Sequence, residues 1–282
     1  MPHSYIDLQR LKGTSGLNLG TGTVHDVVLR VLVENVSEAM DRFLQREIMP
    51  LVGTRHYSGP GGGTLIVDDL ISVTSLKEDD NMDGTFNVTW GTNDYHLAPY
   101  NAEPTKEWGR PYTRLEVSEK SNGTQDEFRK GRQNYQIVGT WGYQYVKSTA
   151  GLNGTLASTS TTSLNLSGTV GTIIAVGQSL EYNTEIVYVT DVPNSTSTAV
   201  TVRRAQRGST ATSGTAQAIQ ILEYPGPVVE ATFIQAARVW RRKDSAFSAV
   251  VGVGEGGQTV VFSGGLDNDV KLFLQPYRRL AI

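Results

Sequence analysis

The sequence predicts an α+β protein: a body of a few helices with β-hairpins, plus an inserted small all-β domain. Two segments carry apolar residues at spacings of three and four, which is typical of helices that bury one face. Runs of β-branched and aromatic residues bounded by turn residues lie between these segments and favour strands. The third observation is a segment dominated by serine, threonine, glycine and β-branched residues, residues 151–222, whose composition sets it apart.

The first long helix is expected to open at Thr23 and Asp26, which resemble a capping box, and to stop before Pro50. Its apolar positions recur at spacings of three and four: Val24, Val27, Val28, Val31, Leu32, Val36, Ala39, Met40, Phe43 and Leu44. A shorter helix around residues 5–11, ended by Gly13, is expected before it. The second long helix begins after YPGP and carries on one face Val229, Phe233, Ala236, Ala237 and Trp240.

Four runs between the long helices predict strands: residues 64–76, 84–91, 113–119 and 135–146. The sequences DDNMDG and KSNG supply turns between them. We therefore expect the body to run as helix, β-hairpins, helix and a C-terminal helix.

The segment 151–222 contains alternating runs such as SLNLSG, EIVYVTDV and TAVTVRR, which predict an ordered β-rich domain. A disordered linker is the alternative, because the serine and threonine content is high. The flanks QYVKSTAG and LEYPGPVV look like the two ends of one insertion. Residues 1–150 and 223–282 are therefore expected to form one discontinuous body.

Composition limits the classes of function. The chain of 282 residues has no cysteine, which excludes disulfides, thiolate metal sites and cysteine nucleophiles. No apolar run approaches the roughly 18 residues of a membrane-spanning helix, and the start MPHSYIDLQRLKG lacks the features of a secretory signal, so we expect neither a membrane nor export. A net charge of −3 argues against an avid nucleic-acid binder, although it permits a local basic patch.

No sequence motif indicates catalysis. The histidines show no metal-ligand spacing: His3, His25, His56 and His96. The glycine-rich stretch SGPGGGT lacks the Lys-Ser/Thr end of a phosphate-binding loop. The sequence DDNMDG resembles the first half of a calcium loop, but Trp90 stands where the bidentate glutamate belongs, so a turn is the stronger interpretation. We expect no enzymatic activity, no metal and no cofactor.

The C-terminal stretch, residues 264–282, predicts an amphipathic helix that ends at Pro276 and continues as an extended hook, YRRLAI. The candidate residues for an interface with another protein or subunit are Leu266, Val270, Phe273, Leu274, Tyr277, Arg278, Arg279 and Ile282. The alternative is that this helix folds back on its own domain.

A basic cluster ends the second long helix and is the best candidate for contact with DNA or a subunit: Arg238, Arg241, Arg242 and Lys243. The alternative is a charge arrangement suited to a helix C-terminus, where cations are favourable.

The order of these elements and several local phrases resemble the head-tail connector, or adaptor, proteins of tailed bacteriophages. The phrases include AMDRFLQREIMP, the helix end ARVWRRKDSA and the tail GLDNDVKLFLQPYRRL. The resemblance covers the body, about 200 residues by position, whereas the β-rich middle and the insertion depart from the usual smaller, mainly helical members. The insertion is similar to small β modules of phage virion proteins, through Glu185, Val189, Val192 and the stretch VTVRRAQRGSTAT.

The resemblance implies a connector body that forms a ring adaptor between the portal and the tail or neck and extends the DNA channel. It implies a homo-oligomeric ring, expected to be a dodecamer, with the portal protein and a stopper or tail-completion protein as partners. Passing DNA would make transient, non-specific contacts. The expected location is the head-tail junction of the virion, after assembly in the host cytoplasm. The alternatives are a capsid-decoration or host-glycan-binding virion protein, and a minor enzyme of unrecognised type.

Overall fold

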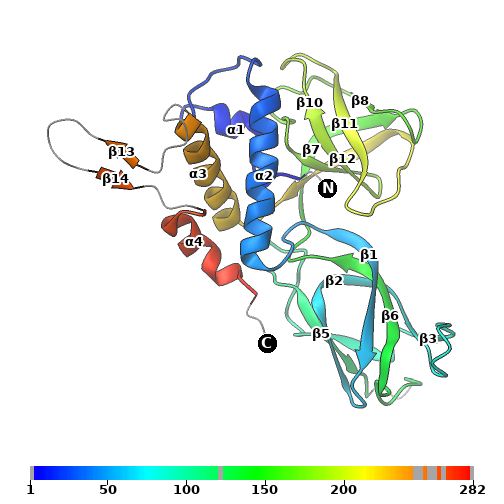
Figure 1. Cartoon of the computed structure of the whole chain (residues 1–282). Helices are drawn as coiled ribbons and strands as arrows, with labels where there is room; N and C mark the ends of the chain where they lie inside the picture. The colour runs from blue at the N-terminus through cyan, green and yellow to red at the C-terminus, as the bar shows by residue number, and fades with distance from the viewer. Residues whose placement is uncertain (1–2, 120–122, 244–249, 253–258, 262–264, 280–282) are drawn as a thin grey trace. The chain divides into compact units, whose positions relative to one another are not determined.

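The structure of the protein is a computed structural model that describes residues 3–119, 123–243, 250–252, 259–261 and 265–279 (Figure 1). The expected fold class is wrong, because strands make up 37% of the protein and helices 21%. Two large antiparallel sheets dominate, and the described residues contain four α-helices. The protein is therefore mostly β, not a connector body of a few helices that carries β-hairpins and a small all-β insertion.

The chain forms two compact units. Unit 1 comprises Met1–Gln45, Ser148–Gln206 and Thr210–Ile282, and unit 2 comprises Arg46–Lys147 and Arg207–Ser209. This division differs from the expected one, since the serine- and threonine-rich segment shares a unit with the helices, while the strands that follow the first long helix form the other unit.

The helices of unit 1 are α1 (Leu8–Lys12), α2 (Asp26–Leu44), α3 (Gly226–Arg242) and α4 (Asn268–Leu274), which continues into a 3₁₀ turn (Gln275–Tyr277). Helices α1 and α3 begin at residues that favour a helix N-terminus. The Asp7 carboxylate accepts a hydrogen bond from the Arg10 amide at 2.7 Å and caps α1, and Pro227 lies in the first turn of α3, where no amide donor is needed. In Figure 1, α2, α3 and α4 lie side by side.

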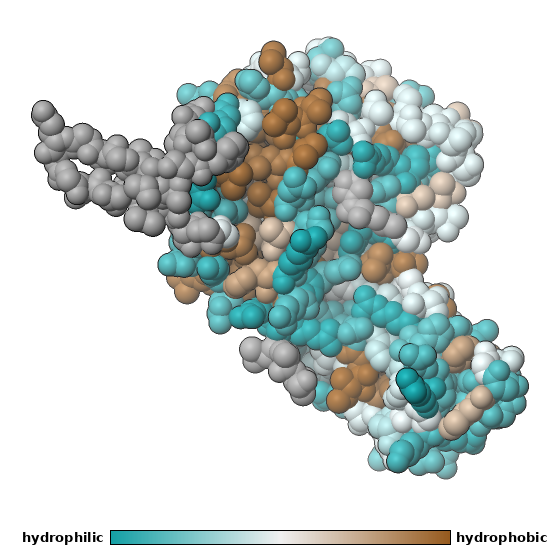
Figure 2. Space-filling view, viewed as in Figure 1, coloured by the Kyte–Doolittle hydropathy of each residue, from teal (hydrophilic) through white to brown (hydrophobic). Residues whose placement is uncertain are grey.

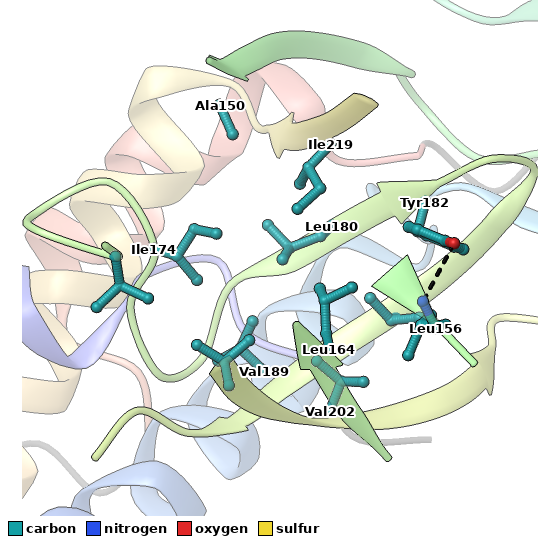
Figure 3. Close-up of a cluster of buried hydrophobic side chains, with 12 residues drawn as sticks. Ala150, Leu156, Leu164, Ile174, Leu180, Tyr182, Val189, Val202 and Ile219 are labelled. Carbon is teal, nitrogen blue, oxygen red and sulfur yellow. Dashed lines mark hydrogen bonds between the residues drawn. The ribbon is translucent and has the colours of Figure 1, made fainter. Parts of the chain in front are cut away.

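The strands between residues 146 and 223 form a closed six-stranded barrel in the order β10-β11-β8-β7-β12-β9. Its strands are β7 (Val146–Leu156), β8 (Ser163–Leu166), β9 (Ser179–Tyr182), β10 (Glu185–Asp191), β11 (Ala199–Gln206) and β12 (Gly214–Glu223). Alternate side chains point inward and form a buried apolar core, as Figure 3 shows for Leu156, Leu164, Leu180, Val189, Val202 and Ile219. The Tyr182 hydroxyl accepts a hydrogen bond from the Leu156 amide at 3.3 Å. The segment is therefore ordered, and the alternative of a disordered linker is excluded.

Unit 2 is a six-stranded antiparallel sheet with the path β1-β6-β2-β5-β4, to which β3 adds by pairing with β2. The strands are β1 (Leu51–Gly59), β2 (Thr64–Glu78), β3 (Val88–Trp90), β4 (Tyr95–Ala98), β5 (Tyr112–Val117) and β6 (Gly131–Trp141). One face buries an aromatic cluster in which Trp90 stacks on Phe128 with ring centroids 4.6 Å apart. The strands that were predicted as hairpins therefore belong to one sheet that has a hydrophobic core of its own.

Two short strands, β13 (Val250–Gly252) and β14 (Thr259–Val261), pair antiparallel between α3 and α4. None of the helices in the part of the chain that the structure describes is long and apolar enough to cross a membrane.

Candidate assembly surface

Helix α2 has two apolar sides, of which only one is covered. Its inner side buries Leu29, Val33, Val36, Met40 and Leu44. The opposite side leaves four valines in solvent, with exposed fractions of 88% for Val24, 68% for Val27, 59% for Val28 and 45% for Val31. These four residues, here called the valine row, lie in the turn before α2 and on its first two turns. Figure 2 shows apolar residues gathered over this half of the helix.

Two charged residues of α2 next to the valine row are paired in the part of the chain that the structure describes. Asp26, beside it, is bound by Lys12 at 2.6 Å, and Arg30 is paired with Glu34 at 3.3 Å. After Val31 the exposed side of α2 turns polar, with Asn35 and the Glu38–Arg42 pair. The apolar surface is therefore confined to the N-terminal half of the helix. Sequence reasoning missed this surface, because it counted the four valines with the apolar positions of the helix.

A groove of about 570 Å³ lies beside the N-terminal end of α2. Its walls include Thr23, which precedes α2, Asp26 of α2, and the apolar residues Ile174, Val176 and Val192 from loops of the barrel segment. The groove and the valine row both belong to unit 1, but none of the four valines is among the groove's lining residues.

Helix α4 places the predicted interface residues on two different sides. Val270 and Leu274 are fully buried against the rest of unit 1, and Leu266 is half-buried. Phe273, with 40% of its surface exposed, and the neighbouring Leu272, at 73%, point outward. Leu272 was not among the predicted residues, since it fell off the face that the spacing defined.

The start of α4 is fixed to the end of α3 by ion pairs. Arg238 binds Asp269 through both terminal nitrogens, at 2.7 and 2.6 Å, and lies 3.1 Å from Asp267. Arg242 also binds Asp267, at 3.2 Å. The hydrogen bonds from Arg238 hold the pKa of the Asp269 carboxyl below its ordinary value.

The other two members of the basic cluster also have contacts within the chain. Arg241 donates to the Gly16 carbonyl at 3.0 Å, and the Lys243 ammonium lies 3.8 Å from the ring centre of Trp240. These contacts match the alternative of an internal charge arrangement at the helix end. Contact of this cluster with DNA stays a prediction.

The described part of the C-terminal hook lies on its own unit. Pro276 does not start an extended segment, because it lies inside the 3₁₀ turn that follows α4. The Arg279 amide donates to the Leu44 carbonyl at 2.9 Å, and the Arg278 guanidinium lies 5.3 Å from the ring centre of Phe43. Burial raises the pKa of Tyr277. Ile282 lies outside the described residues.

The turn DDNMDG is held by hydrogen bonds between its aspartate side chains and its own backbone amides. The Asp79 carboxylate accepts from the amides of Asp83 at 3.2 Å and Gly84 at 2.8 Å. Among the described residues, no group of three histidine, cysteine, aspartate or glutamate side chains is placed to hold a metal ion. The carboxylates of this turn therefore act as caps for amides.

A scan against models of known protein families and a search of curated proteins found no match to this chain. The exposed apolar surface of unit 1 is the functional feature for which the structure gives the clearest observations.

Proposed function

We propose that this protein is a structural subunit of a tailed-phage virion that forms a ring adaptor between the portal and the tail or neck and extends the DNA channel. The valine row carries this proposal. Four adjacent exposed valines, beside which Asp26 and Arg30 are both paired, form the kind of surface that a subunit covers on assembly. A patch of this kind on an amphipathic helix suits protein association, and it does not suit binding to a polyanion.

The ends of α3 and α4 pair through residues of two phrases on which the resemblance to connector proteins was based. The helix-end phrase ARVWRRK supplies Arg238 and Arg242, and the tail phrase GLDNDV supplies Asp267 and Asp269. The two most specific phrases of the resemblance therefore contact each other, although about 30 residues separate them in the sequence. This interaction accounts for their joint presence as a device that fixes the terminal helix.

The oligomeric state of the purified protein tests the proposal. Light scattering over a concentration series should reveal a closed oligomer, and negative-stain images should show rings. The double variant Val27→Ser/Val31→Ser should weaken association more than tenfold, because each buried valine contributes about 1.5 kcal/mol. Asn35→Ser, on the same side of α2 but beyond the valine row, is the matched control and should assemble normally.

Two results would overturn the proposal. One is a wild-type protein that stays monomeric at every concentration, and the other is an oligomer that the valine substitutions leave unchanged.

Gold-labelled protein in virions separates the proposal from capsid decoration, since a ring gives one label at the head-tail axis and decoration gives labels scattered over the shell.

A further inference from the structure

Trp108, in unit 2, differs from the other tryptophans of the chain in its surroundings. Trp90, Trp141 and Trp240 each lie against another aromatic ring or a cation of the same chain. In the part of the chain that the structure describes, no aromatic ring and no cation stacks on Trp108, and 71% of its surface is exposed. Folding therefore leaves this indole open to a ligand.

The loop that carries Trp108 is held in a fixed shape between β4 and β5. The Gly109 amide donates to the Lys106 carbonyl at 2.9 Å and closes a turn around Trp108. The side-chain amide of the buried Gln144 donates to the carbonyls of Glu107 at 2.9 Å and Gly109 at 2.7 Å. These two residues are the chain neighbours of Trp108. The indole is therefore presented by a loop that is already ordered, which lowers the entropic cost of binding.

Exposed side chains of both charges surround Trp108 in this loop: Glu103, Lys106, Glu107 and Arg110. Among the described residues, none of the four forms an ion pair. The two carboxylates accept hydrogen bonds, and the ammonium and guanidinium groups donate them. A polyanion would be repelled by the glutamates and a polycation by the lysine and arginine. A neutral ligand whose groups both donate and accept hydrogen bonds suits all four side chains.

The apolar area around Trp108 limits the size of the partner. A tryptophan side chain contributes roughly 150–250 Å² of contact area, whereas a stable protein interface needs about 800 Å² on each partner. Between Ala102 and Pro111 the other exposed side chains are polar or charged, so they do not extend the apolar area. A single sugar ring is similar in size to an indole, and its C–H groups are attracted to the negative face of the aromatic ring.

We infer that the loop around Trp108 binds a neutral carbohydrate. One sugar ring stacks on the indole, and its hydroxyl groups form hydrogen bonds with the carboxylates and cations beside it. This site goes beyond the proposed ring and does not depend on it, because Trp108 belongs to unit 2 and the valine row belongs to unit 1.

Calorimetric titration of the full-length protein with cellohexaose, chitohexaose and maltohexaose tests the site. At least one of these neutral oligosaccharides should bind with a dissociation constant of about 1 mM or lower. Trp108→Ala should weaken this binding by about tenfold or more, because the stacking surface is lost. Trp108→Phe keeps an aromatic face and should retain part of the affinity. Tryptophan emission should shift to shorter wavelength on saturation in the wild-type protein and not in Trp108→Ala.

Ile66→Ala is the matched control, because Ile66 belongs to the same unit and 68% of its surface is exposed. It should bind the oligosaccharide with unchanged affinity. The inference is overturned if none of the three oligosaccharides binds, or if Trp108→Ala binds as tightly as the wild type. Weaker self-association of Trp108→Ala, with carbohydrate binding unchanged, would assign Trp108 to a protein contact and also overturn it. A protein that binds the oligosaccharide through Trp108 but stays monomeric supports this inference and overturns only the proposed ring.

Discussion

Arg204 and Glu185 form a buried bidentate ion pair in the barrel, with Nε to Oε1 at 2.8 Å and Nη2 to Oε2 at 2.7 Å. Arg204 also donates to the carbonyls of Ser158 at 3.0 Å and Thr161 at 2.6 Å. The Glu185 carboxylate accepts from the amides of Ala205 at 2.6 Å and Thr212 at 2.8 Å. This pair connects the loops that follow β7 and β11. It also gives a structural role to two features of the barrel sequence, Glu185 and the stretch VTVRR, which contains Arg204.

Glu185→Gln should destabilise unit 1 by about 3 kcal/mol, because it leaves the Arg204 guanidinium buried without its counter-charge. Urea denaturation followed by circular dichroism measures the loss. Asp191→Asn, at the exposed end of β10, is the control and should change stability by less than about 0.5 kcal/mol. Equal stability of wild type and Glu185→Gln would show that the pair does not hold the loops.

The contribution of Glu185 should depend on pH. Burial alone would raise the pKa of this carboxyl, but the hydrogen bonds from Arg204, Thr212 and Ala205 outweigh it and leave the pKa below the ordinary value of 4.5. Because the folded-state pKa is lowered, the stabilisation is complete above pH 4.5 and is lost as the pH falls through the folded-state value. The difference in urea midpoint between wild type and Glu185→Gln should therefore shrink only below pH 4.5. A constant difference across the acid range would contradict this.

Ala205 holds a left-handed backbone conformation, with φ of 51°, directly after Arg204. Ala205→Gly should stabilise the barrel by up to about 1 kcal/mol, because glycine adopts this conformation without steric strain and keeps the amide that donates to Glu185. Ala199→Gly, in the same strand, should instead lose about 0.5–1 kcal/mol. Thermal unfolding of the two variants provides the comparison, and destabilisation of both to the same extent would count against strain at Ala205.

Arg238→Ala should loosen α4 with a loss of only about 0.5–1 kcal/mol, because the ion pair with Asp269 is partly exposed. Hydrogen exchange in α4 should become faster, and the effect should fall at high salt. Arg42→Ala, which breaks the exposed Glu38–Arg42 pair within α2, should leave exchange in α4 unchanged. If Arg238→Ala instead lowered retention of DNA without changing this exchange, the basic cluster would act on DNA.

The sequence predicted individual elements better than their assembly. Spacings of three and four located both long helices, and alternation located β2, β3, β5 and β6 but missed β1 and β4. The pairing of strands was not predictable, because paired strands can be far apart in the sequence. Strand β1 pairs with β6 in the register Val52↔Thr140, and almost all of unit 2 lies between these two residues in the chain. Local alternation contains no information on such distant partners, so the sheet of unit 2 was mistaken for hairpins on a helical body.

The candidate site shows a related limit. In α2 the apolar residues occur on two sides, and spacing alone could not separate the buried Leu29 and Val33 from the exposed Val27 and Val28. Exposure depends on which neighbours cover each side, and those neighbours come from distant parts of the chain. The ion pairs of Asp267 and Asp269 with Arg238 could be assigned only once α3 and α4 were seen together, because about 30 residues separate these groups in the sequence.

Leu272 and Leu274 offer a matched comparison on one short helix, since they are the same residue type two positions apart. Leu274→Ala should cost about 2–4 kcal/mol of stability, because this side chain is fully buried and its removal leaves a cavity. Leu272→Ala should change stability by less than about 0.5 kcal/mol, since 73% of its surface is exposed, and should reduce association instead. Urea denaturation measures the first effect, and light scattering measures the second.

Truncation after Leu272 combines loss of the buried Leu274 with loss of the Arg279–Leu44 hydrogen bond and should therefore destabilise unit 1. A stable, folded truncated protein would show that the contacts of the C-terminal segment with α2 contribute little to the fold.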